Sequence, residues 1–247
     1  AAGFFVAGFI AMAVPVWLSI QIAYRRRPVY ARLNSQLDRY QDVIEPLRKL
    51  LTWGVPALLG VFAGLSTATR WQLAMLSFNS VSSGQTDPQF NMDISFYLFD
   101  LPFYQAAVAL FSAIVLLSGL AALITNYVYG SIAVAKRELR VAKAARIQLA
   151  VIAAIYIALQ AVSIWLDQFA TMTSDKGLIT GAGYTDVNAT IPGLQILSVI
   201  AILVALLFIV TAFTGRWRLP LVGTAMLVVA GLILTMGYPW VMQRFIV

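Results

Sequence analysis

The sequence contains no cysteine and no histidine, and these two absences limit its chemistry before any motif is considered. Without cysteine the chain forms no disulfide, offers no thiolate to a metal and has no thiol nucleophile. Without histidine it lacks the commonest general base and the commonest metal ligand. We therefore predict no catalytic, cofactor-binding or metal-binding residue in this chain.

Charged residues are also scarce. They make up 11% of the 247 residues, whereas an ordinary soluble domain has about 25%. Hydrophobic residues reach 61% and the mean hydropathy is +0.84. So few charges cannot cover the surface of a soluble domain, and the composition indicates a protein of the lipid bilayer. The net charge of +7 does not indicate nucleic-acid binding, because no glycine-rich phosphate loop or basic–aromatic module accompanies it.

Long apolar runs are what the sequence has in abundance. A helix needs roughly 20 apolar residues to cross a hydrocarbon core of about 30 Å, and the runs here are too long for the strands of a barrel. We therefore predict an all-α, polytopic transmembrane helical bundle with six spans. The predicted spans are residues 3–24, 50–69, 104–129, 147–168, 192–214 and 219–242.

The basic residues predict which side of the membrane each connector faces. The connectors 25–49, 130–146 and 215–218 hold 14 of the 17 lysines and arginines, and only Arg70, Lys176 and Arg244 fall elsewhere. Since cytoplasmic loops carry the excess of basic residues, these three connectors are predicted to be cytoplasmic. Loops 70–103 and 169–191 are then extracytoplasmic, as are both ends of this chain.

Two of the cytoplasmic connectors have patterns of their own. In the first, apolar residues at helical spacing predict an amphipathic helix that opens near Pro28 and stops at Pro46. The second, Ser131 to Arg146, is expected to be a basic surface helix. Both helices either bind a partner or anionic lipid headgroups, or only fix the topology. The apolar residues of the first helix are Leu33, Leu37, Tyr40, Ile44 and Leu47.

The extracytoplasmic loops are richer in turn and capping residues. Trp71 and the apolar residues after it predict a helix near 71–80 that lies at the membrane interface. Asp87-Pro88 indicates a turn, and Pro102 suits the first turn of the third span. The glycines and the Asp and Asn residues of loop 169–191 predict an ordered polar loop.

These loops supply the candidate site, an outer surface on which another protein region docks. The acids also allow other interpretations. Oxygen ligands without histidine or cysteine would suit Ca²⁺, and two carboxylates close in space would suit general acid–base catalysis. Structural capping of turns and helices is the remaining alternative. The candidate docking residues are Asp87, Pro88, Asp93, Tyr97, Asp186 and Asn188.

Polar residues inside the spans are few. Tyr156 and Gln160 are four residues apart and share one helix face. They predict either a polar track of a transporter or ordinary hydrogen bonding between helices. Gly60 and Gly64 form a GxxxG spacing that allows two helices to approach closely, within the chain or between copies. Prolines in spans one, two and six predict kinks, at Pro15, Pro56 and Pro239.

Three separate motifs carry a family resemblance. They read TDPQFNMDISFYLFDLPFY at 86–104, GAGYTDVNA at 181–189 and RWRLP…YPWVMQRF between 216 and 245. In this order they resemble uncharacterised protein family 0182, a family of bacterial multi-pass membrane proteins. The resemblance implies a bundle of about seven helices followed by a large extracytoplasmic region. This chain would then be a fragment, the bundle without its first helix, and the family implies no catalytic residue.

The combined expectation is a domain of the bacterial plasma membrane that anchors and orients a large extracytoplasmic region. Its expected partners are the lipid bilayer, that C-terminal extracytoplasmic region, and other proteins or further copies of itself. A transporter or channel element for lipid or cell-envelope polymer is the first alternative. An envelope enzyme whose catalytic part lies outside this chain is the second.

Overall fold

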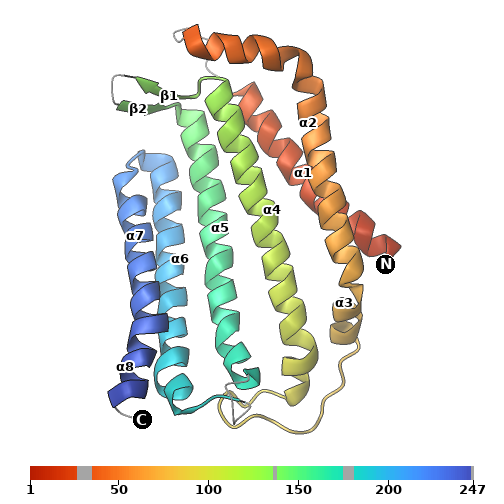
Figure 1. Cartoon of the computed structure of the whole chain (residues 1–247), viewed down its shortest axis with the longest axis vertical. Coiled ribbons are helices and arrows are strands. Elements are labelled where there is room, and N and C mark those ends of the chain that lie inside the picture. Colours follow the sequence, from red (N-terminus) through yellow and green to blue (C-terminus); the bar gives the residue numbers. More distant parts are fainter. Residues whose placement is uncertain (27–34, 136–137, 175–180, 246–247) are drawn as a thin grey trace. The chain divides into compact units, whose positions relative to one another are not determined.

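The computed structural model describes residues 1–26, 35–135, 138–174 and 181–245 (Figure 1). Within these residues the fold is all-α apart from one short β-hairpin. In chain order the elements are α1 (Ala2–Arg25), α2 (Ser35–Thr69), α3 (Trp71–Phe78), η1 (Phe96–Asp100), α4 (Leu101–Val128), β1 (Ile132–Ala135), β2 (Glu138–Val141), α5 (Lys143–Ala170), η2 (Thr171–Thr173), η3 (Asp186–Thr190), α6 (Ile191–Thr214), α7 (Arg218–Leu232), η4 (Ile233–Gly237) and α8 (Tyr238–Phe245).

Six helical segments are long and apolar enough to cross a membrane, which confirms the six predicted spans. The third begins earlier than predicted, because the π-helical turn η1 runs directly into α4. The helix expected near 71–80 is also present, as α3. The six segments are Ala2–Arg25, Arg48–Thr69, Phe96–Val128, Lys143–Thr173, Asp186–Thr214 and Arg218–Val241.

The chain forms two compact units that divide three of the long helices between them. Unit 1 comprises Ala1–Trp71, Ala113–Ile155 and Phe208–Arg216. Unit 2 comprises Gln72–Ser112, Tyr156–Leu207 and Trp217–Val247. The following description takes each unit by itself.

In unit 1, α1 crosses α2 at very short range (Figure 1). A Cβ atom added at Gly60 would lie 2.9 Å from the Phe9 ring, and one added at Gly64 would lie 2.8 Å from the Phe5 carbonyl oxygen. Thr67 stabilises the crossing by donating a hydrogen bond from Oγ1 to the Phe4 carbonyl at 2.8 Å. The GxxxG spacing therefore serves packing within the chain, one of its two predicted uses.

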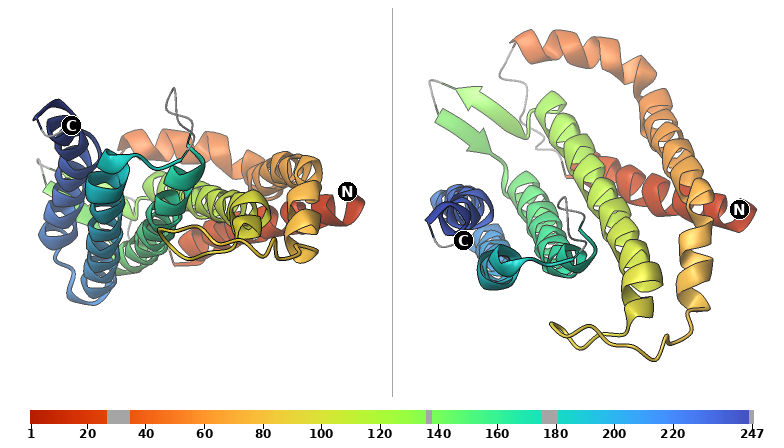
Figure 2. Two further views of the ribbon diagram at one scale, coloured as in Figure 1. Left: turned by 90° about the horizontal axis from the view of Figure 1, so that it is seen from below. Right: turned by 60° about the horizontal axis from the view of Figure 1, so that its bottom comes forward.

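Helix α2 corrects the predicted stop at Pro46. The helix continues through Pro46 and Pro56 without interruption from Ser35 to Thr69, and it changes direction along its length (Figure 2). A proline inside a helix removes one backbone hydrogen bond and bends the helix, but the apolar residues that follow Pro46 still gain from remaining helical. The predicted start near Pro28 and the apolar residue Leu33 lie outside the described residues.

The connector between α4 and α5 corrects a second expectation. In place of the expected surface helix over Ser131 to Arg146, β1 and β2 pair as an antiparallel hairpin, and only the last residues, from Lys143 on, are helical as the start of α5 (Figure 1). The register pairs Ile132 with Val141 and Val134 with Leu139. These four residues alternate with alanine or charged residues, a period of two that suits a strand. Three of the four, two valines and one isoleucine, are β-branched, which also favours a strand. The basic composition concealed this alternation.

Unit 2 contains α3, the part of α4 up to Ser112, the part of α5 from Tyr156, most of α6, and α7 with α8. Helices α6 and α7 lie side by side in both figures (Figures 1 and 2). Gly193 permits close contact at one end of this pair, since an added Cβ would lie 3.0 Å from the Leu234 carbonyl oxygen. Between α5 and α6, Gln195 Nε2 donates to Oε1 of the fully buried Gln168 at 2.8 Å.

Three π-helical turns share one sequence rule. Each ends one residue before an X-Pro pair, with the prolines at 102, 192 and 239. In each turn the amide of the residue before proline donates to the carbonyl five residues earlier, as Leu101 does to Phe96. Proline cannot donate to the carbonyl four residues back and its ring clashes with it, so a wider turn relieves the clash. At Pro239, where a kink was predicted, the helix contains the π-helical turn η4 directly before Tyr238-Pro239.

Candidate docking surface

Asp87 organises the loop between α3 and η1, in unit 2. Its carboxylate Oδ1 accepts the amide N–H groups of Gln89 and Phe90, both at 2.8 Å. Oδ2 accepts the amide of Met92 at 3.1 Å and the hydroxyl of Tyr97 at 2.6 Å. Both side chains are buried. The predicted Asp87-Pro88 turn is therefore closed by its own aspartate.

The backbone of this turn is consistent with that arrangement. Asn91 has a φ of +56°, a left-handed conformation that asparagine adopts more readily than most residues. The Asp87 amide donates to the Met92 carbonyl at 2.9 Å, and Thr86 pairs with Asp93 as an isolated antiparallel bridge. The segment is thus a closed, hydrogen-bonded loop.

Asp93 fixes the preceding part of the same loop. Its Oδ1 accepts the Ser83 hydroxyl at 2.8 Å, the Ser83 amide at 3.1 Å and the Ser95 amide at 2.8 Å. Its Oδ2 accepts the Ser82 hydroxyl. Ser82 and Ser83 were not among the predicted residues, although serines eleven and ten residues before an aspartate are suitable hydrogen-bond partners.

These contacts favour the charged form of both carboxyls. Burial raises the pKa of Asp87, but the hydrogen bonds from the Tyr97 hydroxyl and from three backbone amides outweigh it, so the pKa is lower than usual. The hydrogen bond from Ser82 is the largest cause that lowers the pKa of Asp93 well below its usual range, followed by the amide of Ser95 and the two groups of Ser83. Both aspartates are therefore ionised and act as acceptors at neutral pH.

An aromatic cluster supports the loop from within unit 2. Phe169 of α5 contacts the Phe90 ring at 4.8 Å and the Phe96 ring at 5.4 Å between centroids. Phe96 in turn contacts Tyr97 edge-to-face at 5.3 Å. Such pairs contribute about 0.5–1.5 kcal/mol each beyond the area that they bury. The cluster ties the loop to the end of α5, a long-range contact that no local motif predicted.

The loop before η3 repeats the use of a buried aspartate. Asp186, at the first position of η3, accepts the Gly183 amide at 3.0 Å and the Thr190 hydroxyl at 3.2 Å. Asn188 is exposed and donates to the Tyr184 carbonyl at 2.9 Å. Gly181 has a φ of +118°, the positive φ that the glycines predicted. Gly177 lies outside the described residues.

The six predicted residues thus divide into two kinds. Asp87, Asp93, Tyr97 and Asp186 hold their own loops together, and only Pro88 and Asn188 present exposed side chains. Three large apolar residues are exposed in and beside this loop: Val81 within it is 79% exposed, Phe78 at the end of α3 71% and Leu98 in η1 60%. The other exposed residues of the loop are mostly polar, such as Ser80 and Gln85. The predicted residues therefore mainly stabilise their own loops, and the exposed apolar residues were not among those predicted.

The alternatives find less support in the same residues. Tyr156 and Gln160 are both half-buried, so they are neither sealed nor open to a described cavity. In the part of the chain that the structure describes, no three carboxylates gather as a metal site would require. The carboxylates of Asp87, Asp93 and Asp186 are engaged with amides and hydroxyls of their own loops.

Six apolar helices and an all-α architecture define a polytopic membrane protein. The chain belongs to the uncharacterised protein family UPF0182, whose model matches residues 1–247. It is 59% identical over 243 residues to a UPF0182 protein of Leifsonia xyli subsp. xyli and 55% identical over 243 residues to one of Clavibacter sepedonicus. Each match covers 98% of this chain and 25% of the relative.

A more distant relative, a UPF0182 protein of Tropheryma whipplei, is 43% identical over 242 residues, with the same coverage of both chains. The chain therefore spans about a quarter of the length of the curated relatives that it matches. No solved structure matches the chain.

Proposed function

We propose that this chain is a membrane-embedded scaffold domain that anchors and orients a large extracytoplasmic region, within a complex in the bacterial plasma membrane. The observation that carries the proposal is the loop between α3 and η1. Two ionised aspartates fix its backbone, while Val81 within the loop and Phe78 at the end of α3 stay exposed. A rigid loop that presents apolar side chains outside a membrane is suited to dock a further part of the same protein.

The relatives supply the region that would dock. Three quarters of each matched relative lies outside the match to this chain, so most of such a protein is available to cover the exposed residues. The charge pattern supports the orientation, because 14 of 17 basic residues lie in three connectors on one side.

Contacts within unit 1 agree with that orientation. Gly215, with a φ of +78°, lies against the guanidinium of Arg146, since an added Cβ would lie 2.5 Å from Nη1. Two of the three basic connectors therefore lie together, as expected if both face the cytoplasm.

The test uses cysteine labelling in the complete protein in intact cells. This chain has no cysteine of its own, so Val81→Cys and Lys143→Cys each add one defined thiol to it. If the loop is covered, a membrane-impermeant maleimide labels Val81→Cys slowly, and the additional change Asp87→Ala or Asp186→Ala speeds the labelling by loosening the docked surface. Lys143→Cys is the matched control for orientation and reacts only after permeabilisation.

Two outcomes would contradict the scaffold role. The docking role is wrong if Val81→Cys reacts as fast in the native protein as after denaturation, or if the Asp87→Ala and Asp186→Ala variants assemble and resist protease like the unmodified protein. The orientation is wrong if Lys143→Cys reacts in intact cells. If the docking role fails and the orientation holds, two rival functions stay open. They are transport of lipid or envelope polymer, and envelope catalysis outside this chain.

A further inference from the structure

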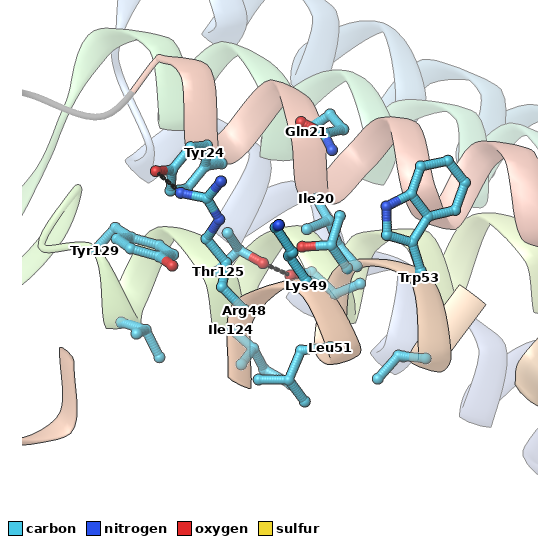
Figure 3. A pocket seen from close by; sticks show the side chains of 14 residues that line it. Ile20, Gln21, Tyr24, Arg48, Lys49, Leu51, Trp53, Ile124, Thr125 and Tyr129 are labelled. Carbon is cyan, nitrogen blue, oxygen red and sulfur yellow. Dashed lines mark hydrogen bonds between the residues drawn. The ribbon is translucent and has the colours of Figure 1, made fainter. Parts of the chain in front are cut away.

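A pocket of about 400 Å³ lies in unit 1, between α1, α2 and the second half of α4 (Figure 3). Its size falls within the range of about 300–1,000 Å³ that is common for small-molecule sites. The lining residues come from the C-terminal ends of the first and third spans and from the N-terminal end of the second. The lining residues are Ile20, Gln21, Tyr24, Arg48, Lys49, Leu51, Thr52, Trp53, Val55, Ala121, Ile124, Thr125, Val128 and Tyr129.

The lining separates into a basic polar part and an apolar part. Arg48 and Lys49 supply two positive charges, and none of the lining residues that the structure describes is acidic. Gln21 and Thr52 add neutral polar groups beside them. The remaining wall is mainly aliphatic, with Leu51, Val55, Ile124 and Val128 among its residues. A ligand that fits both parts carries an anionic group joined to a hydrocarbon portion.

Aromatic contacts fix Arg48 in place. Its guanidinium carbon lies 4.5 Å from the centroid of the Tyr24 ring, and Nη1 donates a hydrogen bond to the Tyr24 hydroxyl (Figure 3). The Tyr24 ring packs edge-to-face against Tyr129 at 5.1 Å. An arginine held this way loses less rotamer freedom on binding, and its planar fork of donors matches the geometry of a phosphate.

The position along the spans fits the membrane interface. Arg48 is the first residue of the second span, Tyr24 is the next-to-last residue of the first, and Tyr129 directly follows the third. Tyrosine and arginine at span ends lie at headgroup depth. On the hydrocarbon side the pocket opens past Leu51, which is 41% exposed, and Ile124, which is 62% exposed.

We propose that this pocket binds one phospholipid with an anionic headgroup, its phosphate held between Arg48 and Lys49 and an acyl chain lying along Leu51, Val55 and Ile124. The orientation in the proposed function places this lipid in the cytoplasmic leaflet; the site itself does not depend on the docking role. A free inorganic anion would use only the basic part and leave the aliphatic wall in contact with water.

The experiment is native mass spectrometry of the complete protein, released from nanodiscs that hold equal amounts of phosphatidylglycerol and phosphatidylcholine. The expected result is one retained phosphatidylglycerol. The double variant Arg48→Gln/Lys49→Gln should lower its affinity about thirtyfold, since each cation near an anionic headgroup contributes about 1 kcal/mol. The matched control is Arg25→Gln/Arg26→Gln, which removes the same charge from exposed residues outside the pocket and should retain the lipid.

A second variant tests the apolar part without changing the charge. Val55→Trp fills the wall of the pocket and should displace the lipid while Arg48 and Lys49 remain. Thermal unfolding of each variant in detergent identifies those that fail to fold, and the charge variant, whose two residues lie at the pocket's polar part, remains informative if Val55→Trp does not fold.

Three outcomes would overturn the assignment. Equal retention in both charge variants would show that Arg48 and Lys49 do not hold the lipid. Equal loss in both would reduce the binding to general surface attraction. Displacement of the lipid by millimolar inorganic phosphate or glycerol 3-phosphate, with binding unaffected in Val55→Trp, would assign the pocket to a free anion instead.

Discussion

Replacing Asp87 with asparagine changes one oxygen to an amide nitrogen and removes one buried charge. The side chain keeps its size, so the loop between α3 and η1 loses little packing. In the native loop Oδ1 accepts two amides and Oδ2 accepts the Met92 amide and the Tyr97 hydroxyl. The variant isolates what this carboxylate contributes to the closed conformation of the loop.

The expected magnitude follows from those four hydrogen bonds. If the asparagine oxygen keeps the amides of Gln89 and Phe90, its NH₂ group faces the Met92 amide, and two donors then oppose each other. The Tyr97 hydroxyl can rotate to accept from the NH₂ group instead. A hydrogen bond to a charged group contributes about 1.5–3 kcal/mol, so we expect the free energy of opening the loop to fall by about 2 kcal/mol.

Hydrogen–deuterium exchange of the protein in nanodiscs measures this change directly. An opening free energy lowered by about 2 kcal/mol speeds exchange about thirtyfold at the Phe90 and Met92 amides. The amides of Ser83 and Ser95, which donate to Asp93, serve as the internal control and should change much less. Exchange at Met92 within twofold of the native rate would refute the structural role given to Asp87.

Two further predictions concern the same loop and the crossing of α1 and α2. Because folding lowers the pKa of Asp87 and Asp93 below their ordinary value of 3.8, their stabilisation is present above that pH and disappears as the pH falls through the lowered values. Amide protection measured against pH should therefore persist to about pH 4; loss near pH 6 would contradict it. Gly64→Ala should lower the free energy of unfolding by about 1–3 kcal/mol, because the alanine Cβ would lie 2.8 Å from a backbone oxygen. Gly54→Ala, whose Cβ meets nothing nearer than 3.8 Å, is the matched control, and equal melting temperatures would refute the close crossing.

Hydropathy and length predicted the spans because crossing a bilayer constrains each segment separately. Each of the six helical segments overlaps one predicted range, although the third and the fifth begin earlier, at Phe96 and Asp186. The same kind of local reasoning found α3 from Trp71 and the turn from Asp87-Pro88. These features depend on residues close together in the chain.

Features that depend on competition or distance were missed. Pro46 predicted a stop, but the apolar run beyond it outweighs one lost hydrogen bond. The β-hairpin was hidden by basic residues, although Ile132 and Val134 alternate as strand residues do. Phe169 reaches the loop from more than 70 positions away in the sequence, and no local pattern indicates such a partner.

For the candidate docking residues, the structural role of each side chain could not be predicted from the sequence. The sequence could show that Asp87 and Asp186 begin ordered turns, and it could not show that their carboxylates point inward to amides of the same loops. The pocket at Arg48 was not predicted, because it needs Tyr24 from one helix and Tyr129 from another. Both become visible only when side chains separated in sequence are placed together.

The three π-helical turns have a consequence for any mutational scan of these spans. Each turn winds one additional residue into the helix, so side chains on its two sides are displaced by about 100° from the positions that an uninterrupted helical wheel assigns. A lipid-accessibility scan should therefore change phase at 96–100, 186–190 and 233–237. The helical period resumes beyond each turn, but with this offset of about 100°. Deleting one residue within such a turn would restore the phase and rotate the outer segment, so function there should tolerate substitutions better than single-residue deletions.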